Sequence, residues 1–204
     1  MTTLHTIRVF GTAPDSIVDG PGLRYSIFVQ GCSHHCAGCH NPESWRPEGG
    51  VRTDVESILT EIRENKIIEG VTLSGGEPFE QAQLCALLAA ECKAMGKNVW
   101  VYSGYIYEDL VRAAERSEDE SVVDHVGALA ASAWRALDPD GVAALLAQAD
   151  VLVDGPFVEE LHSYDLKWRG SANQRLIDMA ATRKAGKVVL WEPYSFVPKK
   201  PSNW

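Results

Sequence analysis

Apolar residues in this chain gather in short runs that alternate with longer stretches of helical periodicity. Five short runs are rich in β-branched and aromatic residues and lie near glycine, asparagine or aspartate, and this composition predicts β-strands. The predicted strands are Arg24 to Gln30, Gly70 to Leu73, Asn98 to Tyr102, Val151 to Asp154 and Lys187 to Leu190.

Between these strands, apolar residues recur at the spacing of one helix face, as Val55, Ile58, Leu59 and Ile62 do. Because strands and helices alternate, we predict an α/β fold built from parallel βαβ units. Ligands bind beyond the carboxyl ends of the strands in such sheets, so the loops that follow strands are the place to look for chemistry. The predicted helices are Asp54 to Glu64, Glu80 to Met95, Tyr107 to Arg116 and Val142 to Ala147.

The loops that follow the first four predicted strands all carry glycine. They read GCSHHCAGCHN, SGGEPFE, SGY and GPF in chain order. Glycine allows a backbone to approach a ligand closely, but it also ends strands, so glycine alone leaves both interpretations open.

The composition favours one globular domain that spans residues 1–204. Of the 204 residues, 45% are hydrophobic and 23% are charged, which is enough apolar material for a core and is not typical of a disordered chain. The formal net charge is −9 and no basic run is present, so we expect no nucleic-acid partner. Since no run approaches the ~20 apolar residues of a membrane span and no signal peptide is recognisable, we expect a cytoplasmic protein with no membrane partner.

Three of the five cysteines lie in the first of these loops, as Cys32, Cys36 and Cys39. Three converging thiolates are typical of a four-iron, four-sulfide cluster with one iron left open for a substrate. The alternative is a zinc site completed by His34, His35 or His40, although the chain offers no second pair of ligands at zinc spacing. The other two cysteines, Cys85 and Cys92, share an apolar helix face and are expected in the core.

The pattern CX3CX2C after the first strand and SGGEP after the next resembles the radical S-adenosylmethionine enzymes. DGPGLR at Asp19 to Arg24 is similar to those members that install a glycyl radical on a partner protein. LVDGPF at Leu152 to Phe157 and KWRGSANQR at Lys167 to Arg175 resemble the activating proteins of the anaerobic, class III ribonucleoside-triphosphate reductase. The resemblance covers some two thirds of the chain, with an extra helical and acidic insert at about 106–148.

The resemblance implies a partial, open (βα) barrel of the radical S-adenosylmethionine type. It also implies that Cys32, Cys36 and Cys39 bind a [4Fe-4S] cluster whose open iron is chelated by S-adenosylmethionine. One electron from a flavodoxin-like or ferredoxin-like donor then gives methionine and a 5′-deoxyadenosyl radical, which removes a hydrogen atom from a glycine of the reductase. The cofactors carry this chemistry, so no side chain is assigned as catalytic.

The resemblance further implies contacts to S-adenosylmethionine in two of these loops. Gly38, Cys39 and His40 are expected against the adenosine, and Gly75, Gly76 and Glu77 against the methionyl amine. His40 stands where an aromatic residue is common in this family. Glu77 is alternatively a charge at a helix start, and the Asp154 turn and the segment with Arg169, Asn173 and Arg175 have no assigned role.

Two further functions remain open at this stage. Within the same enzyme class, the chain would activate another glycyl-radical enzyme or act on a small molecule such as a deazapurine precursor. From a different class, a zinc-binding interaction module would use the same cysteines without redox chemistry.

Overall fold

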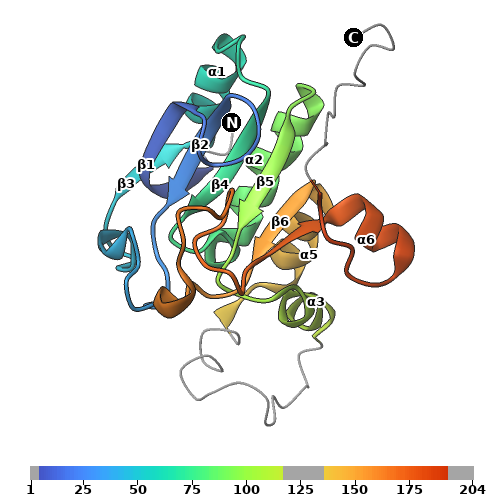
Figure 1. The fold of residues 1–204 in the computed structure, drawn as a ribbon. Helices are drawn as coiled ribbons and strands as arrows, with labels where there is room; N and C mark the ends of the chain where they lie inside the picture. The colour runs from blue at the N-terminus through green and yellow to red at the C-terminus, as the bar shows by residue number, and fades with distance from the viewer. Residues whose placement is uncertain (1–4, 117–135, 193–204) are drawn as a thin grey trace, which may run out of the picture.

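A computed structural model describes residues 5–116 and 136–192 of the chain. They form an open, mixed sheet of seven strands in the order β3-β1-β2-β4-β5-β6-β7, shown in Figure 1. The strands are β1 (Thr6–Ser16), β2 (Arg24–Val29), β3 (Val51–Asp54), β4 (Gly70–Gly75), β5 (Asn98–Tyr102), β6 (Val151–Asp154) and β7 (Arg175–Asp178). The helices are α1 (Val55–Glu64), α2 (Ala82–Ala94), α3 (Tyr107–Glu115), α5 (Pro139–Gln148) and α6 (Met179–Ala185).

The four central strands are parallel, as the alternating pattern predicts. β2 pairs with β4, β4 with β5 and β5 with β6, all in the same direction. Their near-continuous apolar sequences suit strands buried on both faces. An α/β sheet is therefore confirmed, and its parallel centre brings the four glycine-bearing loops to one edge.

Three strands were not predicted from the sequence, and each omission has a physical reason. β1 contains Gly11 and Pro14, and its pairing with β2 shifts register twice, which accommodates both residues. β3 is an edge strand with an exposed start, so it lacks an apolar pattern. β7 is short, begins at a charged residue and runs antiparallel to β6.

The strand predicted at Lys187 to Leu190 is wrong. Leu190 forms only an isolated bridge with Ile177 of β7. The amide of Val189 donates to the hydroxyl of Thr182 at 2.9 Å and is therefore taken out of a strand ladder.

Helices cover one face of the sheet. Cys85, Leu88 and Cys92 of α2 are completely buried in the main core, as expected for that helix face. α5 begins at Pro139 rather than Val142, because the side chain of Asp138 accepts a hydrogen bond from Gly141 N and caps the first turn. Residues 117–135, in the middle of the insert expected at about 106–148, lie outside the described residues, while α3 and α5 form its two ends. No helix of the described part is long and apolar enough to cross a membrane.

The opposite face is covered by the loop between β6 and β7, which crosses in front of the central strands in Figure 1. Trp168 of this loop packs edge-on against Trp100 of β5 at a centroid distance of 5.7 Å. Trp191 follows Leu190, which forms the isolated bridge to β7, and its ring packs edge-on against the rings of Trp100 and Trp168. Arg24 is buried beneath this layer, where its guanidinium donates to Thr72 Oγ1, Val71 O and Asn98 Oδ1.

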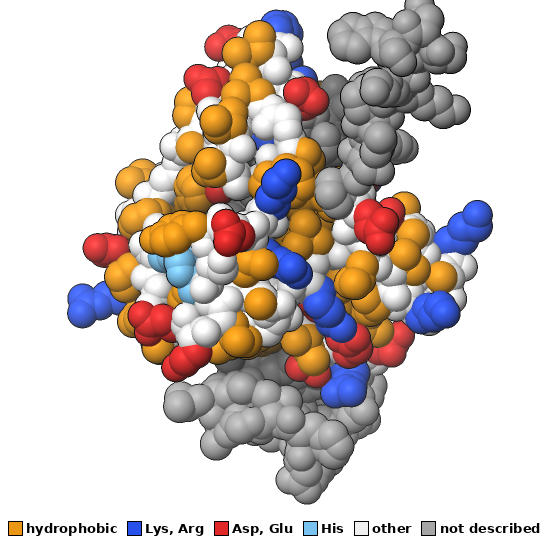
Figure 2. Space-filling view, in the orientation of Figure 1, with side chains coloured by type: hydrophobic (Ala, Val, Ile, Leu, Met, Phe, Trp, Pro, Cys, Tyr) orange, Lys and Arg blue, Asp and Glu red, His pale blue; other side chains and the backbone are white. Residues whose placement is uncertain are grey.

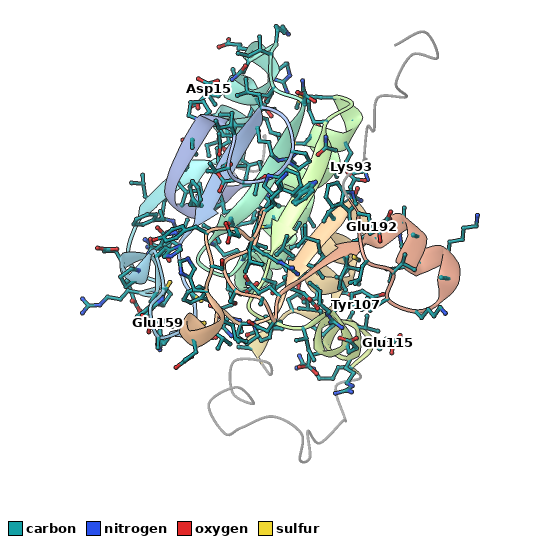
Figure 3. The ribbon with its side chains drawn as sticks, in the orientation of Figure 1. Asp15, Lys93, Tyr107, Glu115, Glu159 and Glu192 are labelled. Atoms are coloured by element: carbon teal, nitrogen blue, oxygen red, sulfur yellow. The ribbon has the colours of Figure 1, made fainter. Side chains whose placement is uncertain are left out.

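Asp154 fixes the ends of β6, α3 and β7. Its side chain is 1% exposed, it forms an ion pair with Arg175, and it accepts from Tyr107 N at 2.7 Å. Arg175 also donates to Glu108, at 2.7 and 3.0 Å. Asp154 and Arg175, which had no assigned role, therefore close a charged network beside the site, where Figure 3 labels Tyr107.

This network predicts a dependence of stability on pH. Hydrogen bonding to Arg175 lowers the pKa of Glu108. A carboxyl with a lowered pKa stabilises the fold above its unfolded pKa, about 4.3, and that contribution is lost as the pH falls through the folded pKa. We expect Glu108→Gln to reduce the free energy of unfolding at pH ~6, with the difference from the unaltered chain shrinking toward pH ~3. Urea unfolding at a series of pH values measures this difference, and a difference that does not change with pH would contradict it.

Candidate functional site

The loops at the carboxyl ends of β2, β4, β5 and β6 enclose one cavity of about 270 Å³. Cys32, Cys36 and Cys39 all line it, and all three are partly buried, free thiols. Seven of the eight predicted site residues thus lie together, because the cavity lining also includes His40, Gly75, Gly76 and Glu77. The exception is Gly38, which does not line the cavity.

Gly38 instead supports the packing of the cysteine loop. Its φ of 69° is left-handed, and a Cβ atom at this position would collide with the carboxylate of Glu159. Figure 3 labels Glu159 on the short 3-10 helix Glu159–Leu161, beside the cysteine loop. Glycine at position 38 therefore lets the loop after β6 close onto the cysteine loop.

The SGGE segment is bound to the start of the cysteine loop. Gly76 N donates to Val29 O and Glu77 N donates to Gly31 O, both at 2.7 Å. A Cβ atom on Gly76 would lie far inside van der Waals contact of the Gly31 carbonyl oxygen. Gly76 is thus required by the close approach of two backbones, whether or not a ligand is bound.

The Glu77 carboxylate is the centre of a buried polar network. Its side chain is 1% exposed. Oε1 accepts from Phe79 N and Ser103 Oγ, both at 3.0 Å, while Oε2 accepts from Gly104 N at 2.8 Å and contacts His34 Nε2 at 3.1 Å. The hydrogen bond from Phe79 N caps the short 3-10 helix Pro78–Gln81, as the helix-start alternative expected. One carboxylate therefore joins the loops after β2, β4 and β5.

His34 is the member of this network that the sequence analysis did not connect to Glu77. Its ring lies against Tyr105 at a centroid distance of 4.4 Å. Burial lowers the pKa of His34, but the hydrogen bond and the charge of Glu77 outweigh burial and raise the pKa above its ordinary value. Since Glu77 lies far from His34 in sequence, only the folded chain brings the pair together.

Two of these thiols, those of Cys32 and Cys36, lie in an environment that opposes their ionisation. Burial raises the pKa of Cys32 to about 12, and the negative charge of Glu77 adds to the effect. Burial also raises the pKa of Cys36. A ligand that brings positive charge, as iron does, is what these thiols require in order to become thiolates.

The arrangement fits a multi-iron cluster better than a single ion. Within residues 5–116 and 136–192, no three His, Cys, Asp or Glu side chains are close enough together to hold one metal ion. The three candidate zinc histidines point to different neighbours: His34 to Glu77, His35 to Trp45 at 4.9 Å, and His40 to Phe157 at 5.5 Å. A cluster with three cysteine ligands needs thiols that surround a shared volume, and the cavity provides this.

The cavity has further walls that the sequence analysis assigned no role. Phe157 and Gln174 come from the loop between β6 and β7, while Tyr102 ends β5 and Ser103 and Gly104 follow it. Gln174 Nε2 donates to Gly155 O at 3.0 Å, and Asn173 Nδ2 donates to Pro156 O at 2.8 Å. Arg169 donates to Gln174 O at 2.8 Å, so the polar residues of KWRGSANQR hold this wall together.

Comparison with known proteins gives consistent matches. Residues 18–177 match a family described as a 4Fe-4S single cluster domain. The anaerobic ribonucleoside-triphosphate reductase-activating protein of Vibrio cholerae is 33% identical over 169 residues, which cover 79% of this chain and 91% of that protein. The protein of the same name from Escherichia coli K12 is 34% identical over 171 residues, covering 79% and 92%.

More distant similarities extend to a virus and to one solved structure. The activating protein of the same name from Enterobacteria phage T4 is 29% identical over 169 residues, which cover 80% of this chain and 88% of that protein. The crystal structure of QueE from Escherichia coli is 18% identical, with a TM-score of 0.36 over 50% of this chain and 53% of that chain. That structural similarity is too low to establish a shared fold.

We expect Gly76→Ala to destabilise the cluster-free chain by ~2 kcal/mol or more, because neither backbone at this contact is free to move away. Gly11→Ala is the matched control, since no atom lies within 4 Å of its added Cβ; we expect it to change the free energy of unfolding by less than ~1 kcal/mol. Denaturant unfolding followed by circular dichroism measures both changes. Equal effects of the two substitutions would show that the close approach at Gly76 is unimportant.

Glu77→Gln keeps the shape of the side chain but replaces one carboxylate oxygen, which accepts hydrogen bonds, with an NH2 group, which donates them. That NH2 group would face other donors. We expect a loss of ~2–3 kcal/mol in the free energy of unfolding, since buried N–H groups are left unpaired. The exposed Glu64→Gln in α1 is the control, expected within ~0.5 kcal/mol of the unaltered chain. The same unfolding measurement applies, and a loss no larger than that of the control would argue against a central role for this carboxylate.

Proposed function

The chain belongs to the family of anaerobic ribonucleoside-triphosphate reductase-activating proteins, and we propose that it installs a glycyl radical on that reductase. We propose that it does so with a [4Fe-4S] cluster and S-adenosylmethionine. The observation that carries this proposal is the cavity in which three free thiols face the backbones of the other strand-end loops. The partner is the reductase, and the electron donor is a flavodoxin-like or ferredoxin-like protein.

When bound, the cluster and S-adenosylmethionine supply one-electron cleavage of the sulfonium and a 5′-deoxyadenosyl radical that takes a hydrogen atom from a glycine of the reductase. The chain itself supplies binding, orientation and exclusion of water. Cys32, Cys36 and Cys39 would hold three irons of the cluster, and metal binding releases protons because the ligands are thiolates. No side chain is proposed to act as a general acid or nucleophile.

The SGGE segment is proposed to bind the methionyl group. The carboxylate of Glu77 already accepts from Phe79, Ser103, Gly104 and His34. An ammonium group at the cavity wall is therefore best held by backbone carbonyls of this segment, while Glu77 supplies a negative potential nearby. Gly75, Gly76 and Glu77 therefore all stay in the proposed site. The backbone of the segment binds the ammonium group, and the Glu77 side chain supplies the negative potential.

The adenosine is proposed to lie beside the end of the cysteine loop. His40 lines the cavity and its ring lies 5.5 Å from that of Phe157, so two rings from different loops offer a surface for stacking. Gly38 and Cys39 precede His40 in the same loop, where Gly38 acts by allowing the chain to turn. The edge of the sheet at the carboxyl ends of the parallel strands is proposed to form the mouth of a partial, open (βα) barrel. This mouth is proposed to admit the glycine-bearing loop of the reductase.

The test is anaerobic iron–sulfur reconstitution, reduction with dithionite and assay for 5′-deoxyadenosine and methionine. Addition of the reductase and electron paramagnetic resonance then report the glycyl radical. A radical on a different glycyl-radical enzyme, or turnover of a small molecule without any protein radical, would assign the chain to another member of the enzyme class. A colourless protein that holds one zinc and leaves S-adenosylmethionine intact would establish the zinc-binding alternative.

Cys36→Ala is expected to abolish cluster assembly and 5′-deoxyadenosine formation together, because one of three protein ligands is lost. Cys85→Ala is the matched control, since Cys85 is buried in the core and does not line the cavity. We expect the control to retain the iron content and the visible absorption of the unaltered chain. An active Cys36→Ala variant without iron would overturn the assignment of the ligands.

A further inference from the structure

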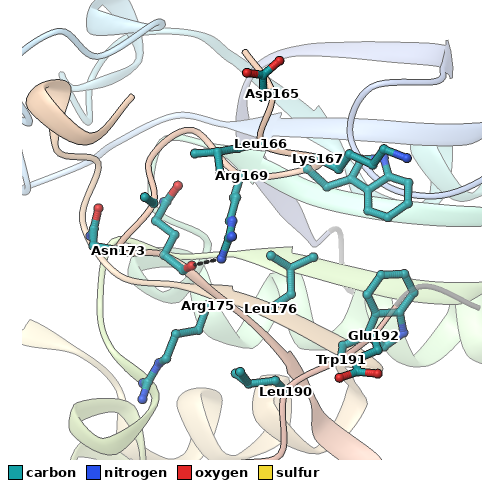
Figure 4. A pocket seen from close by; sticks show the side chains of 13 residues that line it. Asp165, Leu166, Lys167, Arg169, Asn173, Arg175, Leu176, Leu190, Trp191 and Glu192 are labelled. Atoms are coloured by element: carbon teal, nitrogen blue, oxygen red, sulfur yellow. Dashed lines mark hydrogen bonds between the residues drawn. The ribbon is translucent and has the colours of Figure 1, made fainter. Parts of the chain in front are cut away.

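A second pocket, of about 530 Å³, lies on the other side of the loop between β6 and β7. Figure 4 shows Asp165 to Arg169 at the top of the pocket, with Arg175 and Leu190 below and Trp191 and Glu192 at the right. Its apolar lining includes Trp168, Leu176, Leu190 and Trp191. Leu190 is 58% exposed, and it lies beside the indole rings of this lining.

Two cationic side chains line this pocket without acidic partners. Among the described residues, Lys167 makes no hydrogen bond or ion pair, and Arg169 donates only to the backbone oxygen of Gln174. Asp165 and Glu192 also line the pocket but pair with neither cation. Figure 2 shows Lys and Arg side chains in a row across this face, although the whole chain carries a net charge of −9.

The wall that carries these cations is rigidly built. Gln174 Oε1 accepts from Gly170 N at 2.8 Å and from Ser171 N at 3.2 Å. Trp168 has a left-handed φ of 56°, which is rare for a bulky residue, and its carbonyl accepts from Tyr102 Oη at 2.8 Å. Such strain persists only where the surroundings impose it, and it is concentrated at functional sites.

The same wall borders the cavity of the three cysteines. Gln174 lines both the second pocket and the cysteine cavity, and Gly170 lines the cysteine cavity. The second pocket therefore adjoins the cysteine cavity, and a protein that places a glycine of its own at that cavity would have this pocket next to its binding surface.

We propose that this pocket docks the reductase through a segment in which an acidic side chain lies beside an apolar or aromatic one. The acidic group pairs with Lys167 and Arg169, and the apolar group covers Leu190 and the indole rings. This inference rests on the proposed function, because that function supplies the protein partner. The chain's own residues after Glu192 include Lys199 and Lys200, whose charge does not complement the pocket.

The test is the dissociation constant of the complex between the cluster-loaded chain and the purified anaerobic reductase, measured at low and at high salt. We expect Lys167→Glu to weaken binding roughly tenfold at low salt, with a smaller effect at high salt, because an attractive charge becomes repulsive. Adding Leu190→Asp is expected to weaken binding further. Lys184→Glu, an equal charge reversal at an exposed position of α6, is the matched control and is expected to change the constant less than twofold.

Formation of 5′-deoxyadenosine without the reductase separates the two proposals, because Lys167 does not line the cysteine cavity. A variant that cleaves S-adenosylmethionine normally but binds the reductase weakly supports the docking surface. Equal binding by the Lys167→Glu variant and the unaltered chain overturns it while leaving the proposed function intact. If the unaltered chain is a dimer and Lys167→Glu dissociates that dimer, the pocket binds a second copy of the chain. This result also overturns the docking of the reductase. If the unaltered chain neither cleaves S-adenosylmethionine nor binds the reductase, the proposed function itself fails.

Discussion

The buried carboxylate of Glu77 is the interaction on which the geometry of the site depends. A carboxylate withdrawn from water is costly unless its lone pairs are filled, and Glu77 meets this requirement with donors from the loops after β2 and β5 and with Phe79 N of its own segment. Each donor is thereby fixed relative to the others. The position of His34, and with it the start of the cysteine loop, follows from the position of one acid at the end of β4.

Asp154 likewise fixes the position of its hydrogen-bond donors at the end of β6. It is equally buried, it binds the amide at the start of α3, and it forms an ion pair with Arg175 at the start of β7. Two acids at the carboxyl ends of parallel strands therefore organise the loops around the cavity, one on each side. Glu77 caps the short 3-10 helix that follows it, whereas Asp154 accepts from Tyr107 N at the start of α3, a helix that precedes β6 in the chain.

The loop between β6 and β7 contacts both the face of the sheet and the cysteine cavity. Its aromatic residues cover the face of the sheet that no helix covers, and its polar residues bind the backbone after β6. Gln174 lines both the cysteine cavity and the second pocket. The proposed cofactor binding and the proposed docking of the reductase therefore share one structural element.

The sequence by itself determined the central parallel strands, the helices between them and the three cysteines, because these depend on local periodicity and on spacing within one loop. The helix start at Asp138 was missed by a few residues because its capping aspartate precedes the apolar pattern. Strands β1, β3 and β7 were missed because edge positions and register shifts tolerate charged residues, glycine and proline.

Only the tertiary structure decided which partners the site residues have. The spacing of SGGEP marks Glu77 as interesting, but its contacts with Ser103, Gly104 and His34 join segments far apart in the sequence. Gly38 and Gly76 were predicted as site residues, yet the folded chain gives each a structural reason: a left-handed φ at Gly38 and the close approach of the Gly31 backbone at Gly76. Local patterns specify elements and candidate ligands, whereas hydrogen bonds between distant loops depend on how the strands are ordered in the sheet.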